Sequence, residues 1–245
     1  MPANTAVRTL PSASDVNHER TAKTLCFGEL VALPASVPAH VSLWRLDRSE
    51  DNFVAPRSLL TAEDWRELSR LRGDARERGF AVRALLRAAL TDAVGGTIAP
   101  EAWQFTRSNY GKLLLAPHLP ALDFSISHAG TTSCIAISTS GRIGLDIEHC
   151  AVPNWHSLAD DFLLSTDRDM INRAPPAQRE SAFSHAWTAK EAFAKLLGVG
   201  LAVSAPANDC GFGTRLATWD LESPSGALSI SLAFDEPVER ELKRA

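Results

Sequence analysis

The sequence has no apolar run that approaches the roughly 18 residues of a membrane-spanning helix. Its first twenty residues also lack the apolar segment of a secretory signal. The four cysteines, at 26, 134, 150 and 210, are widely spaced and form no C-x-x-C pair, which argues against a zinc ribbon or a redox motif. We therefore expect a cytoplasmic protein with reduced thiols and no membrane partner.

The sequence also lacks a basic excess. Its 25 Lys and Arg residues face 29 Asp and Glu residues, for a net charge of −4, so we expect no nucleic-acid partner. No P-loop is present, and no G-x-G-x-x-G is followed by an acid. With 45% hydrophobic and 22% charged residues, the 245-residue chain has globular composition and room for one large or two small domains.

The order of predicted elements repeats along the chain. Residues 41–47 alternate like a half-buried strand, Thr61 is a predicted N-cap for a helix over 62–72, and a second helix follows over 75–94. In the second part, residues 144–148 again alternate like a strand. A long predicted helix that ends at a glycine follows in both parts.

Residues 76–95 and 179–198 share an Arg, a Glu, a Phe, an Ala and a Gly at matching positions. We infer an internal duplication into two similar α+β halves, with coincidence between amphipathic helices as the alternative. The predicted organisation is an N-terminal extension over 1–40, a first half over 41–140 and a second half over 141–245. Functional sites often lie at such a junction, so we expect the site in the cleft between the halves.

Two acidic residues lie close together in the predicted strand of the second half. Asp146 and Glu148 are two apart, so their side chains project from the same face. The residues between and before them, Leu145 and Ile147 among them, project toward a core. Adjacent carboxylates repel unless a cation lies between them, and such oxygen ligands suit Mg²⁺. The alternative is an ordinary solvated strand face.

A helical stripe in the second half carries Trp187, Glu191 and Lys195 at four-residue spacing, hence on one face. Glu followed by Lys at this spacing is also an ordinary surface pair. The tryptophan on the same stripe indicates partial burial, and a buried carboxylate and ammonium need partners or a ligand.

Two further segments have residues suited to phosphate binding. A predicted strand leads Ser127 and His128 into a loop with Gly130, although no G-x-S-x-G nucleophile elbow is present. These residues could hold phosphate oxygens, or be a turn serine and a surface histidine. Gly111 permits close backbone approach and Lys112 supplies a point charge, although the spacing alone favours a plain β-turn.

Arg83 and Arg87 lie four apart among alanines and leucines, with no acid nearby in the sequence. We expect one of them to face the cleft.

Taken in order, these motifs resemble the 4′-phosphopantetheinyl transferases of the Sfp type. The resemblance is carried by Ile143-Gly-Leu-Asp146-Ile-Glu148 and by Trp187-Thr-Ala-Lys190-Glu191-Ala-Phe-Ala-Lys195, and it covers about residues 41–235. It implies an α+β pseudo-dimer of two similar halves, with the active site in the cleft between them. It also implies a monomer, because one chain supplies both sides of that cleft.

The resemblance implies transfer of 4′-phosphopantetheine from coenzyme A to a serine of an apo acyl or peptidyl carrier protein, with release of adenosine 3′,5′-bisphosphate. The implied cofactor is Mg²⁺, with Mn²⁺ as the alternative ion, held by Asp146, Glu148 and Glu191. Glu191, Lys195 and Asp146 are the implied catalytic residues. Other readings of the scaffold are a different Mg²⁺-dependent phosphotransferase and a non-catalytic module that binds coenzyme A or carrier proteins.

The residues that the resemblance assigns to coenzyme A come from both predicted halves: Arg83, Gly111, Lys112, Ser127, His128, Lys190 and Lys195. In this assignment Lys190, which points about 100° away from Glu191 on the helix, contacts the other side of the cleft. One position departs from the family: Leu113 stands where proline often follows Gly-Lys.

Overall fold

The structure is a computed structural model that describes residues 28–48, 55–150, 152–199 and 213–235. Residues 1–27 of the predicted extension lie outside these ranges, and so do residues 236–245 of the predicted second half.

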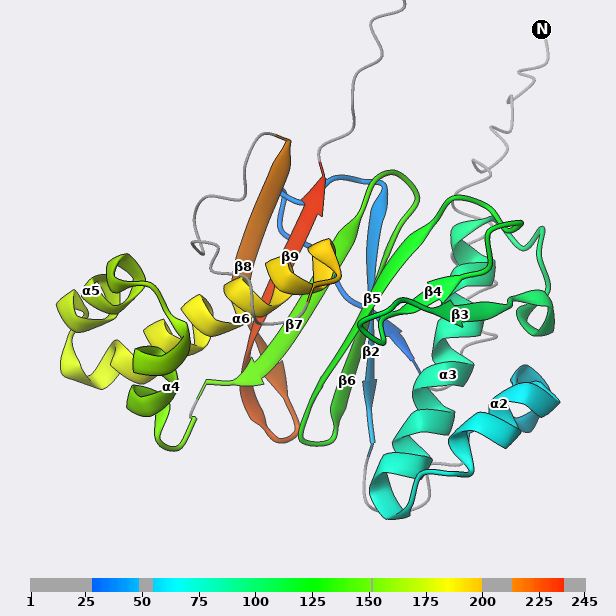
Figure 1. Cartoon of the computed structure of the whole chain (residues 1–245), viewed down its shortest axis with the longest axis horizontal. Helices are drawn as coiled ribbons and strands as arrows, with labels where there is room; N and C mark the ends of the chain where they lie inside the picture. Colours follow the sequence, from blue (N-terminus) through cyan, green and yellow to red (C-terminus); the bar gives the residue numbers. More distant parts are fainter. Residues whose placement is uncertain (1–27, 49–54, 151, 200–212, 236–245) are drawn as a thin grey trace, which may run out of the picture.

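The described residues form a mixed α+β fold with two larger antiparallel sheets and a two-stranded one (Figure 1). The strands are β1 (Glu29–Leu30), β2 (Val41–Asp47), β3 (Phe105–Arg107), β4 (Leu113–Leu115), β5 (Asp123–Ala129), β6 (Thr132–Ser138), β7 (Ile143–His149), β8 (Thr214–Ser223) and β9 (Gly226–Asp235). The helices are α2 (Ala62–Leu68), α3 (Gly73–Ala93), α4 (Trp155–Phe162), α5 (Ser165–Arg173) and α6 (Arg179–Leu197). Short 3₁₀ turns occur at η1 (Arg57–Leu59), η2 (Pro100–Ala102) and η3 (Pro176–Gln178).

The two sheets share one connection order. The first sheet runs β1-β2-β6-β5 and the second runs β7-β9-β8, while β3 and β4 form a separate hairpin. In the first sheet, β2 precedes the helices and pairs with the last strand, β6, which forms a hairpin with β5. In the second sheet, β7 precedes the helices and pairs with the last strand, β9, which forms a hairpin with β8. The order agrees with the predicted repeat, whereas the duplication itself stays a prediction.

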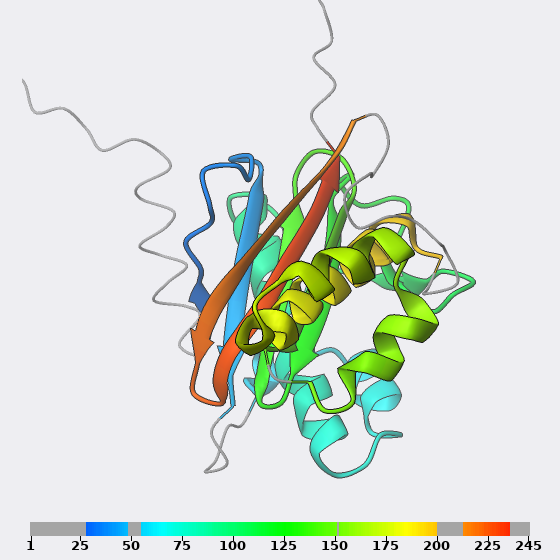
Figure 2. The same cartoon turned by 90° about the vertical axis from the view of Figure 1, so that its left-hand side faces the viewer.

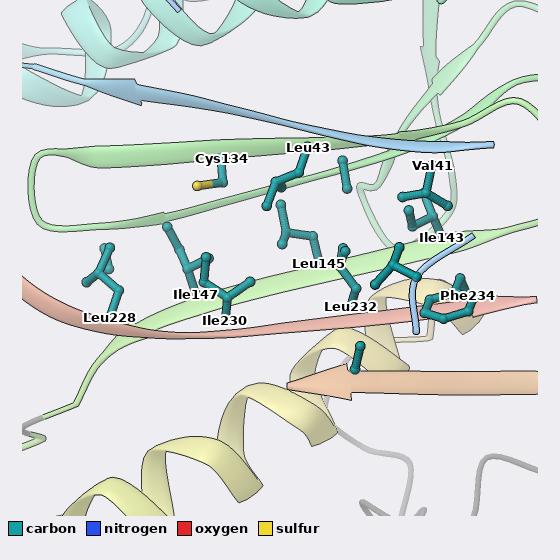
Figure 3. Close-up of a cluster of buried hydrophobic side chains, with 14 residues drawn as sticks. Val41, Leu43, Cys134, Ile143, Leu145, Ile147, Leu228, Ile230, Leu232 and Phe234 are labelled. Atoms are coloured by element: carbon teal, nitrogen blue, oxygen red, sulfur yellow. The ribbon is translucent and has the colours of Figure 1, made fainter. Parts of the chain in front are cut away.

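The main core lies between the sheets (Figure 3). Ile143, Leu145 and Ile147 on β7 are fully buried there, which confirms the predicted inward face of that strand. The opposite faces are covered by helices: α3 packs on the first sheet and α6 on the second (Figures 1 and 2). Because side chains alternate along a strand, the other face of β7 is directed toward α6.

The first helix begins as predicted. The Thr61 hydroxyl accepts a hydrogen bond from the Asp64 backbone N–H, and the Asp64 carboxylate accepts one from the Thr61 N–H, which completes a capping box. The helix ends at Leu68, earlier than the predicted residue 72, and α3 begins at Gly73.

Arg83 and Arg87 of α3 are paired with acids, contrary to their isolated setting in the sequence. Arg83 and Arg87 both donate to the buried carboxylate of Asp64 from α2, and Arg83 also donates to Glu67. Burial alone would raise the pKa of Asp64, but the Arg87 hydrogen bond, the Thr61 N–H and the two guanidinium charges together hold that pKa below its ordinary value of 3.8.

Replacing Asp64 by Asn should therefore lower the free energy of unfolding by about 3 kcal/mol at neutral pH, because buried Arg87 loses its carboxylate partner and buried Arg83 keeps only that of Glu67. Since the folded pKa is lowered, this contribution is present above the ordinary carboxyl pKa and is lost as the pH falls through the folded value. Urea unfolding at neutral pH and below pH 3.8 measures it. The gap between wild type and variant should shrink in acid. Asp74→Asn, which breaks exposed pairs with Arg48 and Arg78, should cost about 1 kcal/mol.

Candidate active site

A glycine allows α6 to lie directly on β7. A Cβ atom built on Gly144 would lie 1.9 Å from the backbone oxygen of Ala192 and 2.5 Å from the backbone nitrogen of Leu196. These distances are too short for any side chain, so the helix contacts the strand backbone to backbone. The next residues on the same face of β7, Asp146 and Glu148, therefore lie beneath α6.

Asp146 is the buried centre of the site, with only 3% of the residue exposed. Its Oδ1 accepts hydrogen bonds from Lys195 Nζ at 2.7 Å and from Ser127 Oγ at 2.8 Å. Its Oδ2 is buried and has no hydrogen-bond partner among the described residues. Burial raises the pKa of Asp146, and the Lys195 charge and hydrogen bond oppose that rise only in part.

Two more carboxylates share this environment. The pKa of Glu148 is raised to about 7, first by burial and then by the charges of Asp146 and Glu191, while a hydrogen bond from Trp187 opposes the rise. The pKa of Glu191 is also raised, by burial and by the Asp146 charge. All three shifts have the same sign because burial is the largest cause of each, and the lysine charges oppose the rise only in part.

The described residues contain no group of three or more His, Cys, Asp or Glu side chains already arranged to hold a metal ion. The chemistry of Asp146, Glu148 and Glu191 nevertheless fits a hard divalent cation, because carboxylate oxygens are its preferred ligands. The orphaned Oδ2 of Asp146 is a buried acceptor still available to such an ion.

A pocket of about 360 Å³ is lined by one of the three carboxylates, Glu191, and by Lys195, which contacts Asp146. Glu191 and Lys195 of α6 line one side, and Gly111 and Lys112 of the turn between β3 and β4 line the other. Gly111 has φ +84°, the left-handed conformation that glycine adopts without strain. The structure thus brings together four residues predicted from separate motifs. It adds Tyr110, 72% exposed and also lining the pocket, which the sequence analysis missed.

Ser127 and His128 lie within β5 rather than in a loop, and Gly130 makes the turn that follows. As adjacent strand residues they project from opposite faces. The Ser127 hydroxyl is buried against Asp146, whereas His128 is exposed. The pKa of His128 is lowered, first by partial loss of water around the ring and then by the charges of Arg78 and Lys195.

Two predicted ligand residues lie elsewhere. Arg83 lines a separate pocket of about 240 Å³ and is paired there with Asp64 and Glu67. Lys190 is buried, and its Nζ donates to the carbonyl oxygen of Phe162 at the end of α4. A lysine at a helix C-terminus is favoured by the helix dipole. The structure therefore places the Lys190 ammonium against α4, which belongs to the same predicted half as Lys190 and not to the other side of the cleft. The coenzyme A roles of Arg83 and Lys190 stay predictions.

These features define a carboxylate-rich site beside a lysine-lined pocket. In a comparison with known proteins, residues 142–223 match the 4′-phosphopantetheinyl transferase superfamily. The chain is 29% identical over 168 residues to the 4′-phosphopantetheinyl transferase HetI of Nostoc sp., covering 66% of this chain and 70% of HetI. It is 34% identical over 119 residues to a 4′-phosphopantetheinyl transferase of Bacillus subtilis, covering 49% of this chain and 51% of that protein.

A shorter match, 36% identical over 76 residues, is to the 4′-phosphopantetheinyl transferase AcpT of Salmonella typhimurium, with coverage of 31% of this chain and 40% of AcpT. The chain spans between 40% and 70% of the length of these relatives, and the Sfp-type subgroup stays a prediction. None of the helices in the described ranges has the length and apolarity needed to cross a membrane.

Proposed function

We propose that this protein transfers 4′-phosphopantetheine from coenzyme A to a serine of an apo carrier protein. The observation that carries the proposal is a cluster of three acidic residues and one lysine beside a pocket. The cluster consists of Asp146, Glu148, Glu191 and Lys195. Gly111 and Lys112 line the pocket together with Glu191 and Lys195. Membership of residues 142–223 in the superfamily supports it. In the reaction the serine Oγ–phosphorus bond forms, and the bond from that phosphorus to adenosine 3′,5′-bisphosphate breaks.

The three carboxylates would hold Mg²⁺, or Mn²⁺, which neutralises pyrophosphate charge when bound. Glu191 takes the proton of the attacking serine hydroxyl. Burial and the Asp146 charge raise the pKa of Glu191, and a carboxylate with a higher pKa is a stronger base. Lys195 follows Glu191 by one helical turn and supplies positive charge for the leaving phosphate. Asp146 fixes the Lys195 ammonium by the 2.7 Å contact.

Coenzyme A would occupy the pocket of about 360 Å³. Lys112 contributes a point charge, and the Gly111 backbone lets the nucleotide approach closely. His128 is an exposed imidazole near the Arg78 and Lys195 charges, an environment that attracts phosphate oxygens. The family resemblance adds Ser127, Arg83 and Lys190 to this set.

The larger architecture belongs to the same proposal. An extension over 1–40 precedes two duplicated halves, 41–140 and 141–245, and the active site lies in the cleft between them. The shared strand order of the two sheets supports this division. The enzyme would act as a cytoplasmic monomer on acyl or peptidyl carrier proteins, as in polyketide or nonribosomal peptide synthesis.

The test is intact-mass spectrometry of apo acyl and peptidyl carrier proteins incubated with this protein, coenzyme A and Mg²⁺. The carrier should gain one phosphopantetheine, and the gain should vanish with EDTA or when the carrier serine is replaced by alanine. No gain on any carrier, in a protein shown to be folded, contradicts the proposal. Transfer of a different group would instead indicate another phosphotransferase.

Replacing His128 by Ala should raise the KM for coenzyme A about tenfold and leave kcat nearly unchanged, because a hydrogen bond to a charged group contributes roughly 1.5–3 kcal/mol. Steady-state kinetics at saturating carrier protein measure both constants. His118→Ala, an exposed histidine near the β3–β4 hairpin, is the matched control and should change neither. An unchanged KM in His128→Ala would remove this residue from the phosphate site.

A further inference from the structure

The face of the second sheet that lies beneath α6 (Figure 1) is divided into one apolar row and two polar rows. Residues directly opposite one another on neighbouring strands lie on the same face and close together. Across β7, β9 and β8 the three rows are Gly144–Ala233–Leu216, Asp146–Ser231–Thr218 and Glu148–Ser229–Asp220. The sheet therefore offers α6 an apolar surface at one position and hydroxyl or carboxylate groups at the next two.

The residues of α6 match these rows turn by turn. Ala192 and Leu196 are buried in one cluster with Ala233 of the apolar row. One turn earlier, Thr188 contacts the polar rows through its hydroxyl. One turn of helix covers about 5.4 Å, so a slip of α6 by one turn would put either the Thr188 hydroxyl over the apolar row or Ala192 over the hydroxyls. The pattern of the sheet thus favours one position of α6 along it.

A buried group of hydroxyls joins α6 to β9. Thr188, Ser229 and Ser231, which we call the hydroxyl cluster, are all fully buried. Thr188 Oγ1 lies 3.0 Å from Ser229 Oγ and 2.9 Å from Ser231 Oγ, and it donates to the backbone oxygen of His185 at 3.2 Å. A hydroxyl has one donor and two acceptor lone pairs. With the donor used on the helix, the Thr188 oxygen accepts from both serines and is saturated.

The hydroxyl cluster lies next to the acidic centre, because its two serines are the β9 partners of Asp146 and Glu148. On the helix, Thr188 precedes Glu191 by three residues and Lys195 by seven, spacings that keep side chains on one side of a helix. The position of Thr188 on the sheet therefore also sets the position of these two side chains. The 2.7 Å contact between Lys195 and Asp146 depends on it.

We propose that Thr188 is a positioning residue, which fixes α6 along the second sheet through the hydroxyl cluster and so brings Glu191 and Lys195 to Asp146. The inference rests on the proposed function. The close contact at Gly144 determines how near α6 lies to β7, and the hydroxyl cluster determines where along the sheet the helix lies. Because Thr188 is fully buried, it acts through other side chains and touches no substrate.

The test begins with three single variants. Thr188→Val keeps the branched shape and loses the hydroxyl, whereas Thr188→Ser keeps the hydroxyl. Thr218→Val is the matched control: Thr218 is exposed on β8, and in the described part of the chain its hydroxyl bonds to Ser231 and not to α6. Assays use the full chain with coenzyme A, Mg²⁺ and a carrier protein modified by wild type. They measure kcat, the KM for coenzyme A and the free energy of unfolding.

We expect Thr188→Val to lower kcat about tenfold, because a displacement of about 1 Å at reacting groups costs up to about a hundredfold. The KM for coenzyme A should stay within about twofold of wild type, since the affected contacts act on the transition state. Thr188→Ser should recover most of the lost kcat, and Thr218→Val should leave kcat unchanged.

A triple variant separates positioning from simple stabilisation. Thr188→Val combined with Ser229→Ala and Ser231→Ala removes every hydroxyl of the cluster, and replacing all partners by apolar groups costs little stability. Its free energy of unfolding should therefore lie closer to wild type than that of Thr188→Val. Its kcat should stay about tenfold low, because the row of Ser231 no longer differs from the apolar row. A cluster that only stabilises the fold would instead let kcat recover together with stability.

Normal kcat in Thr188→Val would overturn the inference, and so would recovery of kcat in the triple variant. Should Thr188→Val not fold, the triple variant decides between these outcomes. If the wild-type protein transfers no phosphopantetheine, the proposed function fails, and the inference is then judged on stability. Additive effects of Thr188→Val and Ser231→Ala on the free energy of unfolding would show that the two hydroxyls are not coupled and would overturn it.

Discussion

Glu191→Gln should lower the rate of phosphopantetheine transfer by roughly a hundredfold or more and at the same time make the protein slightly more stable. Loss of one carboxylate removes both the proposed base and a proposed cation ligand, and cation stabilisation of phosphate charge contributes several kcal/mol to catalysis, at about 1.4 kcal/mol per tenfold in rate. Glu191 is held near Asp146, and its raised pKa means that its charged form is unfavourable in the folded state. A neutral amide of the same size relieves that repulsion.

The sign of the pH dependence follows from the raised pKa. The charged form of Glu191 costs stability above the folded pKa, and this cost disappears below the ordinary carboxyl pKa, where the group is protonated in both states. The advantage of Gln should therefore be full at alkaline pH and vanish in acid. Thermal unfolding across pH, together with the carrier-protein mass assay, measures the two effects.

Glu77→Gln is the matched control for this experiment. Glu77 is exposed on α3 and pairs with Arg76, so its loss should change neither rate nor stability by a measurable amount. Near-normal transfer by Glu191→Gln would show that the carboxylate is neither base nor ligand. A clear loss of stability at alkaline pH would contradict the repulsion among the carboxylates.

The parts of the fold that the sequence predicts well are those with local signals. Alternation along residues 41–47 and 144–148 gives β2 and the centre of β7, and the Thr61 capping box marks the start of α2. The same alternation predicts that Asp146 and Glu148 share a face. Helical spacing predicts a common face for Glu191 and Lys195, which both line the pocket. These predictions hold because a strand or helix fixes side-chain direction over a few residues.

What the sequence does not reveal depends on contacts between distant segments. Arg83 has no acid within four residues of it along α3, yet α2 brings Asp64 to it from 19 residues away. Lys190 stands beside Glu191 in the motif, but its direction is set by the end of α4. The Ser127 hydroxyl accepts a hydrogen bond from Lys195, which lies 68 residues further along the chain. Such pairings follow from packing, which a one-dimensional pattern does not contain.

Gly144→Ala is the second change for which we expect a large effect, a loss of both transfer rate and stability that follows from geometry alone. The added Cβ would lie 1.9 Å from the Ala192 backbone oxygen, and neither strand nor helix backbone can give way as a flexible side chain would. The helix α6 must therefore shift outward, with Glu191 and Lys195 on it. A misplacement of about 1 Å at reacting groups costs on the order of a hundredfold in rate, and overpacking costs about 1–3 kcal/mol of stability or more.

Circular dichroism melting and the mass assay should show both losses together in Gly144→Ala. Gly96→Ala separates this effect from a general cost of replacing glycine. Gly96 has φ +77° and no described atom within 4 Å of an added Cβ, so the change strains the backbone near the end of α3 by about 1–2 kcal/mol without moving the site. We expect lower stability but normal transfer in Gly96→Ala. If Gly144→Ala keeps wild-type stability and rate, α6 does not lie against β7 as closely as the structure places it, and the approach of Lys195 to Asp146 must have another cause.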